Sequence, residues 1–138
     1  MIRRNIEQAV LAGLKDTPVV LLVGARQTGK STLIQSDALR KNRRRFLSFD
    51  DTSVLAAAKA DPAGFLASFP EPLALDEVQR VPEIFLALKA SVDRDRVPGR
   101  YLVSGSANVL VLPRVADSLA GRMEVITLWP FSQGEIES

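Results

Sequence analysis

The residues with the clearest chemical signature lie between positions 24 and 32, in the stretch GARQTGKST. Gly24, Gly29, Lys30 and Ser31 match the pattern GxxxxGKS/T, which cradles nucleotide phosphates when it joins a strand to a helix. The glycines let the backbone turn its N–H groups toward phosphate oxygens, and the positive end of the following helix adds to the attraction. At average residue frequencies, such a match arises by chance in roughly one chain in two hundred of this length.

Each residue of this loop is expected to contribute to a site for the phosphates of a nucleotide. Lys30 is expected to reach the β and γ phosphates as a mobile positive charge, and the Ser31 hydroxyl is expected to ligate Mg²⁺. Thr32 is expected nearby, within the first helical turn. The residues expected to bind phosphate are Gly24, Ala25, Arg26, Gln27, Thr28, Gly29, Lys30, Ser31 and Thr32.

A pair of acidic residues, Asp76 and Glu77, follows the apolar stretch PLAL. Open α/β sheets bind ligands at the carboxyl ends of their strands, so this pair is expected beside the phosphate loop. Asp76 is expected to hold Mg²⁺, mostly through water, and Glu77 is expected to polarise the attacking water as a base. The chain has no histidine and no cysteine, so acid–base work falls to carboxylates. The alternative is that the two acids cap the next helix.

Polar residues also end the stretch YLVSGSAN. Ser104, Ser106 and Asn108 are candidates for aligning the attacking water beside the γ phosphate, and the sequence does not select among them. The alternative is that these side chains satisfy backbone groups in a turn.

Hydrophobic periodicity predicts the elements that must position these residues. Apolar residues recur every four positions from Ile2 to Leu14, which predicts an amphipathic helix over residues 2–15. Val19 to Val23 is a continuous valine-rich run, typical of a central parallel strand covered on both faces. Four more strands are predicted at RFLSFDD, PLALDEVQ, YLVSGSA and MEVITL.

Helices are predicted in the intervals between these strands. They are expected from Lys30, over residues 56–60, from a capping Asp61, from Pro82, and over residues 109–122 with a break at Pro113. The alternation of strand and helix predicts an α/β protein whose parallel sheet is sandwiched between helices.

Composition limits the classes of function that the chain can have. Its 138 residues, 46% of them hydrophobic, support one globular domain. A net charge of +2 does not support attraction of the whole molecule to nucleic acid or to a membrane surface. No apolar run approaches the roughly 20 residues of a membrane span. The absence of cysteine and histidine excludes disulfides and their metal sites. A cytoplasmic location follows by default.

The densest run of charge is basic, and it contains Arg40, Lys41, Arg43, Arg44 and Arg45. A nucleic-acid contact is one interpretation, but no aromatic residue interleaves with the charges before Phe46. A solvated turn between helix and strand is therefore the favoured interpretation.

Four stretches together resemble the AAA+ branch of phosphate-loop ATPases: GARQTGKST, LALDEVQ, LVSGSAN and SLAGRMEVITLWPFSQGE. The resemblance narrows to the prokaryotic AAA domain 14 group, in which an ATPase module precedes a C-terminal domain of unknown function. Ala25 stands where that family usually carries proline, which is expected to soften the loop slightly. The most specific matches are Arg26, Gln27, Gln79, Gly121, Arg122, Pro130 and Glu135.

This resemblance implies a three-layer αβα P-loop NTPase fold with a parallel five-stranded sheet of order 5-1-4-3-2 and an N-terminal amphipathic helix. It implies Mg²⁺-dependent ATP hydrolysis through water attack on the γ phosphate, driving conformational change in a larger protein. The phosphate loop would be 24–32, the Walker B strand 72–77 and the sensor region 103–108. Residues 1–138 would be an ATP-binding core without helical lid or C-terminal domain, partnered by ATP and by a second copy or that missing domain.

Arg122 is a further catalytic candidate that the resemblance brings forward. A planar guanidinium can neutralise transition-state charge, within the chain or across a subunit interface, and contributes about 10³ to 10⁵ in rate where it does so. The alternative is a structural ion pair with Asp117 or Glu124, and the sequence leaves both open.

Two other functions are compatible with these motifs. One is an ATP-gated switch or scaffold with little turnover, and the other is a GTPase or small-metabolite kinase. The second lacks support, because the chain has neither a guanine signature of the N/T-K-x-D type nor an arginine-rich lid after the fourth strand.

Overall fold

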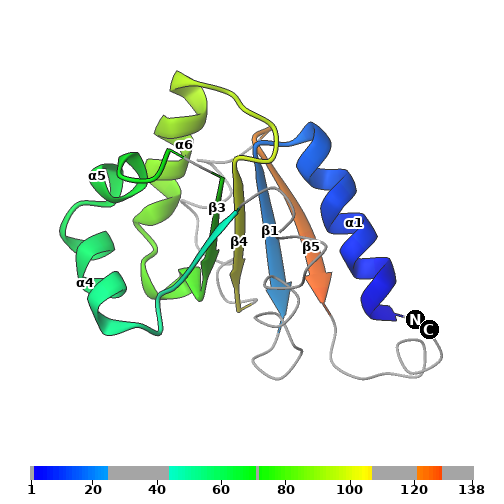
Figure 1. Cartoon of the computed structure of the whole chain (residues 1–138), viewed down its shortest axis with the longest axis horizontal. Helices are drawn as coiled ribbons and strands as arrows, with labels where there is room; N and C mark the ends of the chain where they lie inside the picture. Colours follow the sequence, from blue (N-terminus) through cyan, green and yellow to red (C-terminus); the bar gives the residue numbers. More distant parts are fainter. Residues whose placement is uncertain (1, 25–43, 71, 107–120, 129–138) are drawn as a thin grey trace.

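The computed structural model describes residues 2–24, 44–70, 72–106 and 121–128, which form a sheet with helices on both faces (Figure 1). The strands are β1 (Val19–Gly24), β2 (Arg45–Ser48), β3 (Leu73–Asp76), β4 (Tyr101–Gly105) and β5 (Met123–Leu128). The helices of this part of the chain are α1 (Ile2–Asp16), α4 (Thr52–Ala60), α5 (Pro62–Ala67) and α6 (Ile84–Arg94), with a 3₁₀ turn η2 (Val78–Arg80).

The five strands are arranged in the order β2-β3-β4-β1-β5, and each neighbouring pair is parallel. This is the predicted order 5-1-4-3-2 read from the opposite side of the sheet, so the fold class is confirmed. Because every strand runs the same way, all carboxyl ends lie at one edge, at the arrowheads in Figure 1. Any ligand site of the kind expected for open α/β sheets belongs at this edge.

The central strand β1 is buried at every position, as its continuous apolar run predicted. Val19, Leu21 and Val23 point into a core shared with α4, α5 and α6. Val20 and Leu22 point into a second core, which α1 covers. Strands buried on both faces read as unbroken hydrophobic runs, so the sandwich explains the sequence VVLLV.

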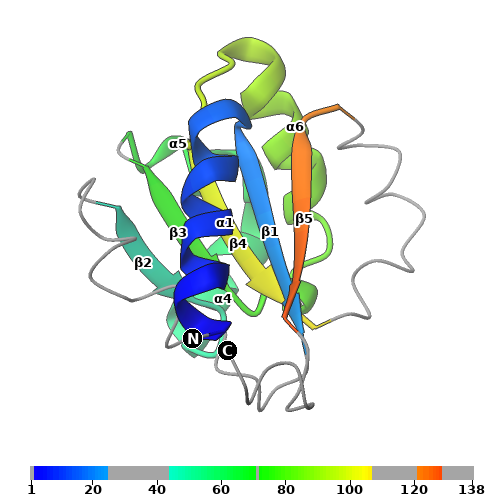
Figure 2. The same ribbon diagram turned by 90° about the vertical axis from the view of Figure 1, so that its right-hand side faces the viewer.

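Helix α1 lies across one face of the sheet, as Figure 2 shows, and it confirms the predicted amphipathic N-terminal helix. Val10 and Leu14 of its apolar stripe are buried against the sheet. Gly13 permits the close approach, since a Cβ there would lie 3.2 Å from Val20 Cγ2. None of the helices in the ranges given above is long and apolar enough to cross a membrane.

Two aspartates cap the helices on the opposite face. The predicted start at Asp61 is confirmed, because the Asp61 carboxylate accepts from Gly64 N at 3.0 Å and Pro62 occupies the first turn. The helix predicted over 56–60 begins earlier, at 52, because the Asp51 carboxylate accepts from Ser53 N at 2.9 Å. The Asp51 cap lies three residues after the end of β2 and starts α4, which then packs on the face of the sheet.

Candidate active site

Three predicted site residues meet at the carboxyl edge of the sheet, on the adjacent strands β3, β4 and β1. Asp76 ends β3, Ser104 lies one residue before the end of β4, and Gly24 ends β1. The Ser104 Oγ donates a hydrogen bond of 2.5 Å to Asp76 Oδ1. Because parallel strands lie about 4.8 Å apart, the first glycine of the phosphate loop starts about 10 Å from the acid pair. The topology thus brings the start of the loop and the acids to one edge.

Asp76 is a buried carboxylate, with 3% of its surface exposed. Its backbone carbonyl accepts from Phe49 N at 3.0 Å, which fixes the end of β3 against the chain that leaves β2. Burying a carboxylate costs free energy unless donors replace the lost water, and the fully buried Ser104 hydroxyl is one such donor. The arrangement holds the Asp76 side chain in a fixed orientation at the strand end.

Glu77 adopts a left-handed backbone conformation, with φ 61° and ψ 46°. Among the residues that the structure describes, it alone has a positive φ without being glycine. This conformation costs about 1–2 kcal/mol for a residue with a side chain, and such strain is concentrated at functional sites. It also corrects the predicted strand PLALDEVQ, which ends at Asp76 because the chain turns at Glu77 into the 3₁₀ turn η2.

Gln79 joins Glu77 to the end of β4. The Gln79 Nε2 donates to Glu77 Oε1 at 2.6 Å, and the backbone N–H of Ser106 donates to Gln79 Oε1 at 3.1 Å. The sequence marked Gln79 only as a family feature and did not predict these contacts. The available signal was a polar residue between Val78 and Val81, both of which are buried.

The three candidates for aligning the attacking water have different surroundings. Ser104 is bonded to Asp76, so its hydroxyl is directed to the expected metal ligand. Ser106 is half-buried, and its backbone N–H is bonded to Gln79. Asn108 lies outside the described residues. Ser104 therefore contacts Asp76 directly, whereas Ser106 contacts Gln79, which in turn is bonded to Glu77.

The predicted phosphate contacts lie beyond the part of the chain that the structure describes, except for Gly24. The roles of Lys30 and Ser31 therefore stay predictions. The same is true of the other loop residues, which are Ala25, Arg26, Gln27, Thr28, Gly29 and Thr32.

Arg122 lies at the opposite edge of the sheet, immediately before β5. Its Nε donates to Asp93 Oδ1 of α6 at 2.6 Å, and this bond is the first cause that lowers the pKa of Asp93. The sequence proposed Asp117 or Glu124 as the ion-pair partner of Arg122. Asp117 lies outside the described residues, and the sequence did not predict the bond to Asp93. The six residues of β5, rising about 3.3 Å each, put some 20 Å between Arg122 and the carboxyl edge. A structural ion pair, the alternative given from the sequence, exists with Asp93 as its partner, and a catalytic role of Arg122 stays a prediction.

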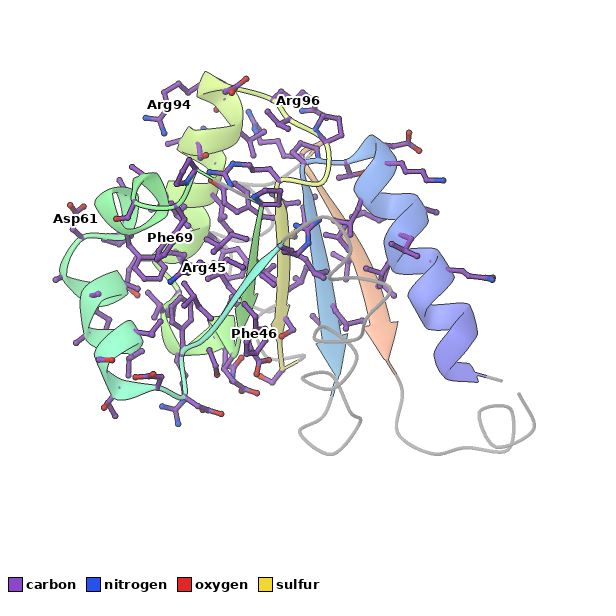
Figure 3. The ribbon with its side chains drawn as sticks, viewed as in Figure 1. Arg45, Phe46, Asp61, Phe69, Arg94 and Arg96 are labelled. Atoms are coloured by element: carbon purple, nitrogen blue, oxygen red, sulfur yellow. The ribbon has the colours of Figure 1, made fainter. Side chains whose placement is uncertain are left out.

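The basic run differs from the predicted solvated turn at Arg44. The Arg44 side chain is buried and donates to the Gly99 carbonyl at 2.8 Å. Burial, and then the charge of Arg100, lower the pKa of Arg44 to about 10. Arg45 is exposed and lies over the Phe69 ring at 5.3 Å, a contact visible in Figure 3. The other basic residues of the run, Arg40, Lys41 and Arg43, lie outside the described ranges.

The oxygen donors at the carboxyl edge suit a magnesium ion. Mg²⁺ prefers hard oxygen ligands and usually takes one or two carboxylates together with phosphate oxygens. Asp76 supplies such a carboxylate, already oriented by Ser104. No group of three or more acidic, histidine or cysteine side chains able to hold a metal occurs within the described residues. The residues present fit an ion that is shared with a phosphate ligand.

A parallel sheet of this order, with a glycine loop after β1 and acids after β3, defines an AAA-type P-loop ATPase core. The sequence pattern of the AAA domain family matches residues 16–137. The chain belongs to this family.

The chain is also similar to two curated proteins in sequence and to several solved structures in fold. The chain is 36% identical over 126 residues to uncharacterised proteins of Mycobacterium bovis and Mycobacterium tuberculosis, covering 91% of this chain and 28% of each relative. A Walker-type ATPase of Pyrococcus abyssi has a similar fold, with TM-score 0.61 and 14% identity over 96% of this chain and 55% of that one. The RuvB Holliday junction branch migration motor of Thermotoga maritima has TM-score 0.54 and 19% identity, over 99% and 47%.

Proposed function

We propose that the chain binds ATP with Mg²⁺ and hydrolyses it by attack of water on the γ phosphate. The observation that carries this proposal is the meeting of Gly24, the buried acid pair and Ser104 at one edge of the sheet. Membership of the AAA domain family supports it independently. The contacts of this edge resemble those that phosphoryl transfer requires, which are positioning and charge stabilisation rather than covalent chemistry.

The loop residues and Asp76 divide the binding of the triphosphate between them. Gly24 to Thr32 would surround the phosphates with backbone N–H groups, and Lys30 would neutralise the β and γ phosphates. Ser31 and Asp76 would hold Mg²⁺, which when bound neutralises charge on the phosphate oxygens. The Ser104 hydroxyl, which donates to Asp76 Oδ1, would help to orient that carboxylate toward the ligand.

Glu77 would act on the attacking water. Glu77 is 8% exposed, follows the carboxyl end of β3, and has the acceptor oxygens needed to take a proton from water. Ser104 and Ser106 would complete the alignment of that water from the end of β4.

Arg122 would serve the site of a neighbouring subunit. It is about 20 Å from the carboxyl edge of its own sheet, so it can reach a γ phosphate only across an interface between copies of the chain. A second copy, or a further domain of a longer protein, is therefore a proposed partner along with ATP. The chain spans 28% of the length of the curated relatives that it matches, and the conformational work driven by ATP would belong to the whole protein.

Phosphate release measured with Mg²⁺ and with excess chelator tests the proposal. The wild-type chain is expected to release phosphate only with Mg²⁺. Glu77→Gln is expected to bind ATP normally and to lose about 10² to 10⁴ in turnover, the usual contribution of a general base. Lys30→Ala is expected to lose ATP binding itself. Glu83→Gln, an identical change at an exposed acid outside the site, is the matched control and should change neither quantity.

Other outcomes distinguish the alternatives. Tight ATP binding without turnover in the wild-type chain would favour an ATP-gated switch. Preference for GTP, or transfer of the phosphate to a small metabolite, would contradict the proposal in favour of another P-loop enzyme.

A further inference from the structure

Gln79 connects two parts of the site that are distant in the sequence. One end of its amide donates to the Glu77 carboxylate at 2.6 Å, two residues back along the chain. The other end accepts from the backbone N–H of Ser106 at 3.1 Å, 27 residues further on. Gln79 thus links the Glu77 carboxylate to the end of β4 through two hydrogen bonds of one amide.

The partners of Gln79 determine which way its amide must point. A carboxylate offers only acceptors, and a backbone N–H offers only a donor. If the amide turned over, Nε2 would face the Ser106 N–H and Oε1 would face the Glu77 carboxylate. Two hydrogen bonds would become two repulsive contacts. Only a side chain with a donor and an acceptor at this separation can make both contacts, and glutamine has them.

Gly105 provides the space that this amide occupies. A Cβ at position 105 would lie 2.9 Å from Gln79 Oε1 and 3.0 Å from Val78 Cγ2. Gly105 does not have a positive φ, so its backbone conformation is open to other residues. The requirement at Gly105 is therefore one of volume, and the Gln79 amide and the Val78 side chain take up that volume.

The turn that carries Gln79 is itself fixed. Val78 and Val81 are fully buried, and the Arg80 N–H donates to the Glu77 carbonyl at 3.1 Å. The left-handed backbone of Glu77 directs the chain into this turn. The Gln79 amide thus approaches Glu77 from a rigid support and limits the positions open to the carboxylate.

We propose that Gln79 is a positioning residue for hydrolysis: its amide holds the Glu77 carboxylate in one orientation and ties that orientation to the end of β4 at Ser106. This inference rests on the proposed function, in which Glu77 acts on the attacking water. In this role Gln79 acts through Glu77 and not directly on the water or the nucleotide. Its loss should therefore slow the chemical step and leave ATP binding as it was.

Four variants of the 138-residue chain test this inference. Gln79→Ala removes the amide, Gln79→Met removes its polarity at similar size, and Gln79→Glu opposes Glu77 with a second carboxylate. Gly105→Ala displaces the amide without removing any polar group. Each is expected to lower kcat by about 10- to 100-fold, the scale associated with small misplacement of a catalytic group, while KM and the Kd for ATP stay within about threefold.

The double variant Gln79→Ala with Gly105→Ala separates positioning from general damage. In the Gln79→Ala background the methyl added at position 105 no longer displaces an amide and meets only Val78, so the double variant is expected to be little slower than Gln79→Ala alone. If the two changes were independent packing defects, their losses in kcat would instead multiply in the double variant. Gln8→Ala, at an exposed glutamine of α1, is the control for loss of a glutamine side chain.

Several results would overturn the inference. Wild-type kcat in Gln79→Ala and Gln79→Met would do so, as would parallel losses in kcat, ATP affinity and melting temperature. If the wild-type chain itself binds ATP without turnover, the proposed function and this inference fall together. If the wild type turns ATP over and the Gln79 variants match it, the inference alone falls.

Discussion

At the scale of single residues, the two adjacent acids have different environments because the backbone changes conformation between them. Asp76 is the last residue of a strand and meets a hydroxyl from the next strand. Glu77 turns out of the strand with positive φ and meets an amide two residues further on. Successive side chains of a strand point to opposite faces, so an unbroken strand would have separated these carboxylates. The turn at Glu77 keeps both at the carboxyl edge.

The strain at Glu77 leads to a prediction about stability. Glu77→Gly is expected to be more stable than Glu77→Ala by about 1 kcal/mol, because only glycine adopts a positive φ without steric cost. Both variants remove the same carboxylate and the same contact with Gln79, so their difference isolates the backbone. Urea unfolding of the two proteins measures it.

The same pair of substitutions at Glu124 serves as the control for the strain at Glu77. Glu124 is exposed on β5, where glycine weakens a strand relative to alanine. The order of the two variants should therefore reverse at Glu124. Equal stability of Glu77→Gly and Glu77→Ala would contradict the strain described for the folded protein.

At the scale of elements, hydrophobic periodicity predicted what lies inside the strands and helices better than where they end. The apolar runs of β1 and β5 and the stripe of α1 match the structure closely. The end of β3 and the start of α4 do not, because a left-handed Glu77 and a capping Asp51 determine them. The apolar residues before Asp51 predict that it ends a strand. In the structure its carboxylate caps the helix that follows, α4.

The Asp51 cap is predicted to make part of the stability depend on pH. Hydrogen bonds from the Ser53 side chain and then from the Ser53 and Val54 backbone lower the pKa of Asp51 in the folded state. A lowered folded-state pKa gives stability that is present above the unfolded value near 3.9 and is lost as pH falls through the folded value. The destabilisation caused by Asp51→Ala should thus be greatest at neutral pH and shrink below about pH 4.

Asp51→Asn separates charge from capping in this experiment. Asparagine also caps helices but does not titrate in this range, so its advantage over alanine should be constant with pH. Urea unfolding of the three proteins at neutral and acidic pH makes the comparison. A gap between wild type and Asp51→Ala that does not change with pH would contradict the assignment of the cap.

At the scale of the whole molecule, the topology explains which site residues could be predicted together. Gly24 and Asp76 end parallel strands and Ser104 lies one residue before the end of another, so fold class alone brought them to one edge. The contact of Gln79 with Ser106 depends on side-chain packing between distant segments, and no spacing rule encodes it. The place of Arg122 likewise follows from the direction of its strand. Its position before a strand, rather than after one, places it at the far edge, where Arg96 also donates to the Gly121 carbonyl (Figure 3).

The distance of Arg122 from its own site predicts complementation between copies of the chain. Arg122→Ala and Glu77→Gln are each expected to be nearly inactive alone. Mixed together, they should recover part of the hydrolysis, because a subunit with an intact Glu77 can receive Arg122 from its neighbour. Phosphate release measured across mixing ratios tests this expectation.

A variant carrying both changes serves as the control for mixing. Added to wild type, it should only dilute activity. Failure of the two single variants to restore each other would limit Arg122 to its bond with Asp93, between α6 and the start of β5.

The burial of β1 on both faces has a consequence for how the molecule opens. A strand with neighbours on both sides and a core on each face is protected from fraying, so we expect its amide protons to exchange mainly when the whole domain unfolds. Gly24 is the last residue of that strand. The first residue of the phosphate loop is therefore anchored to the part of the protein that is last to become accessible to water.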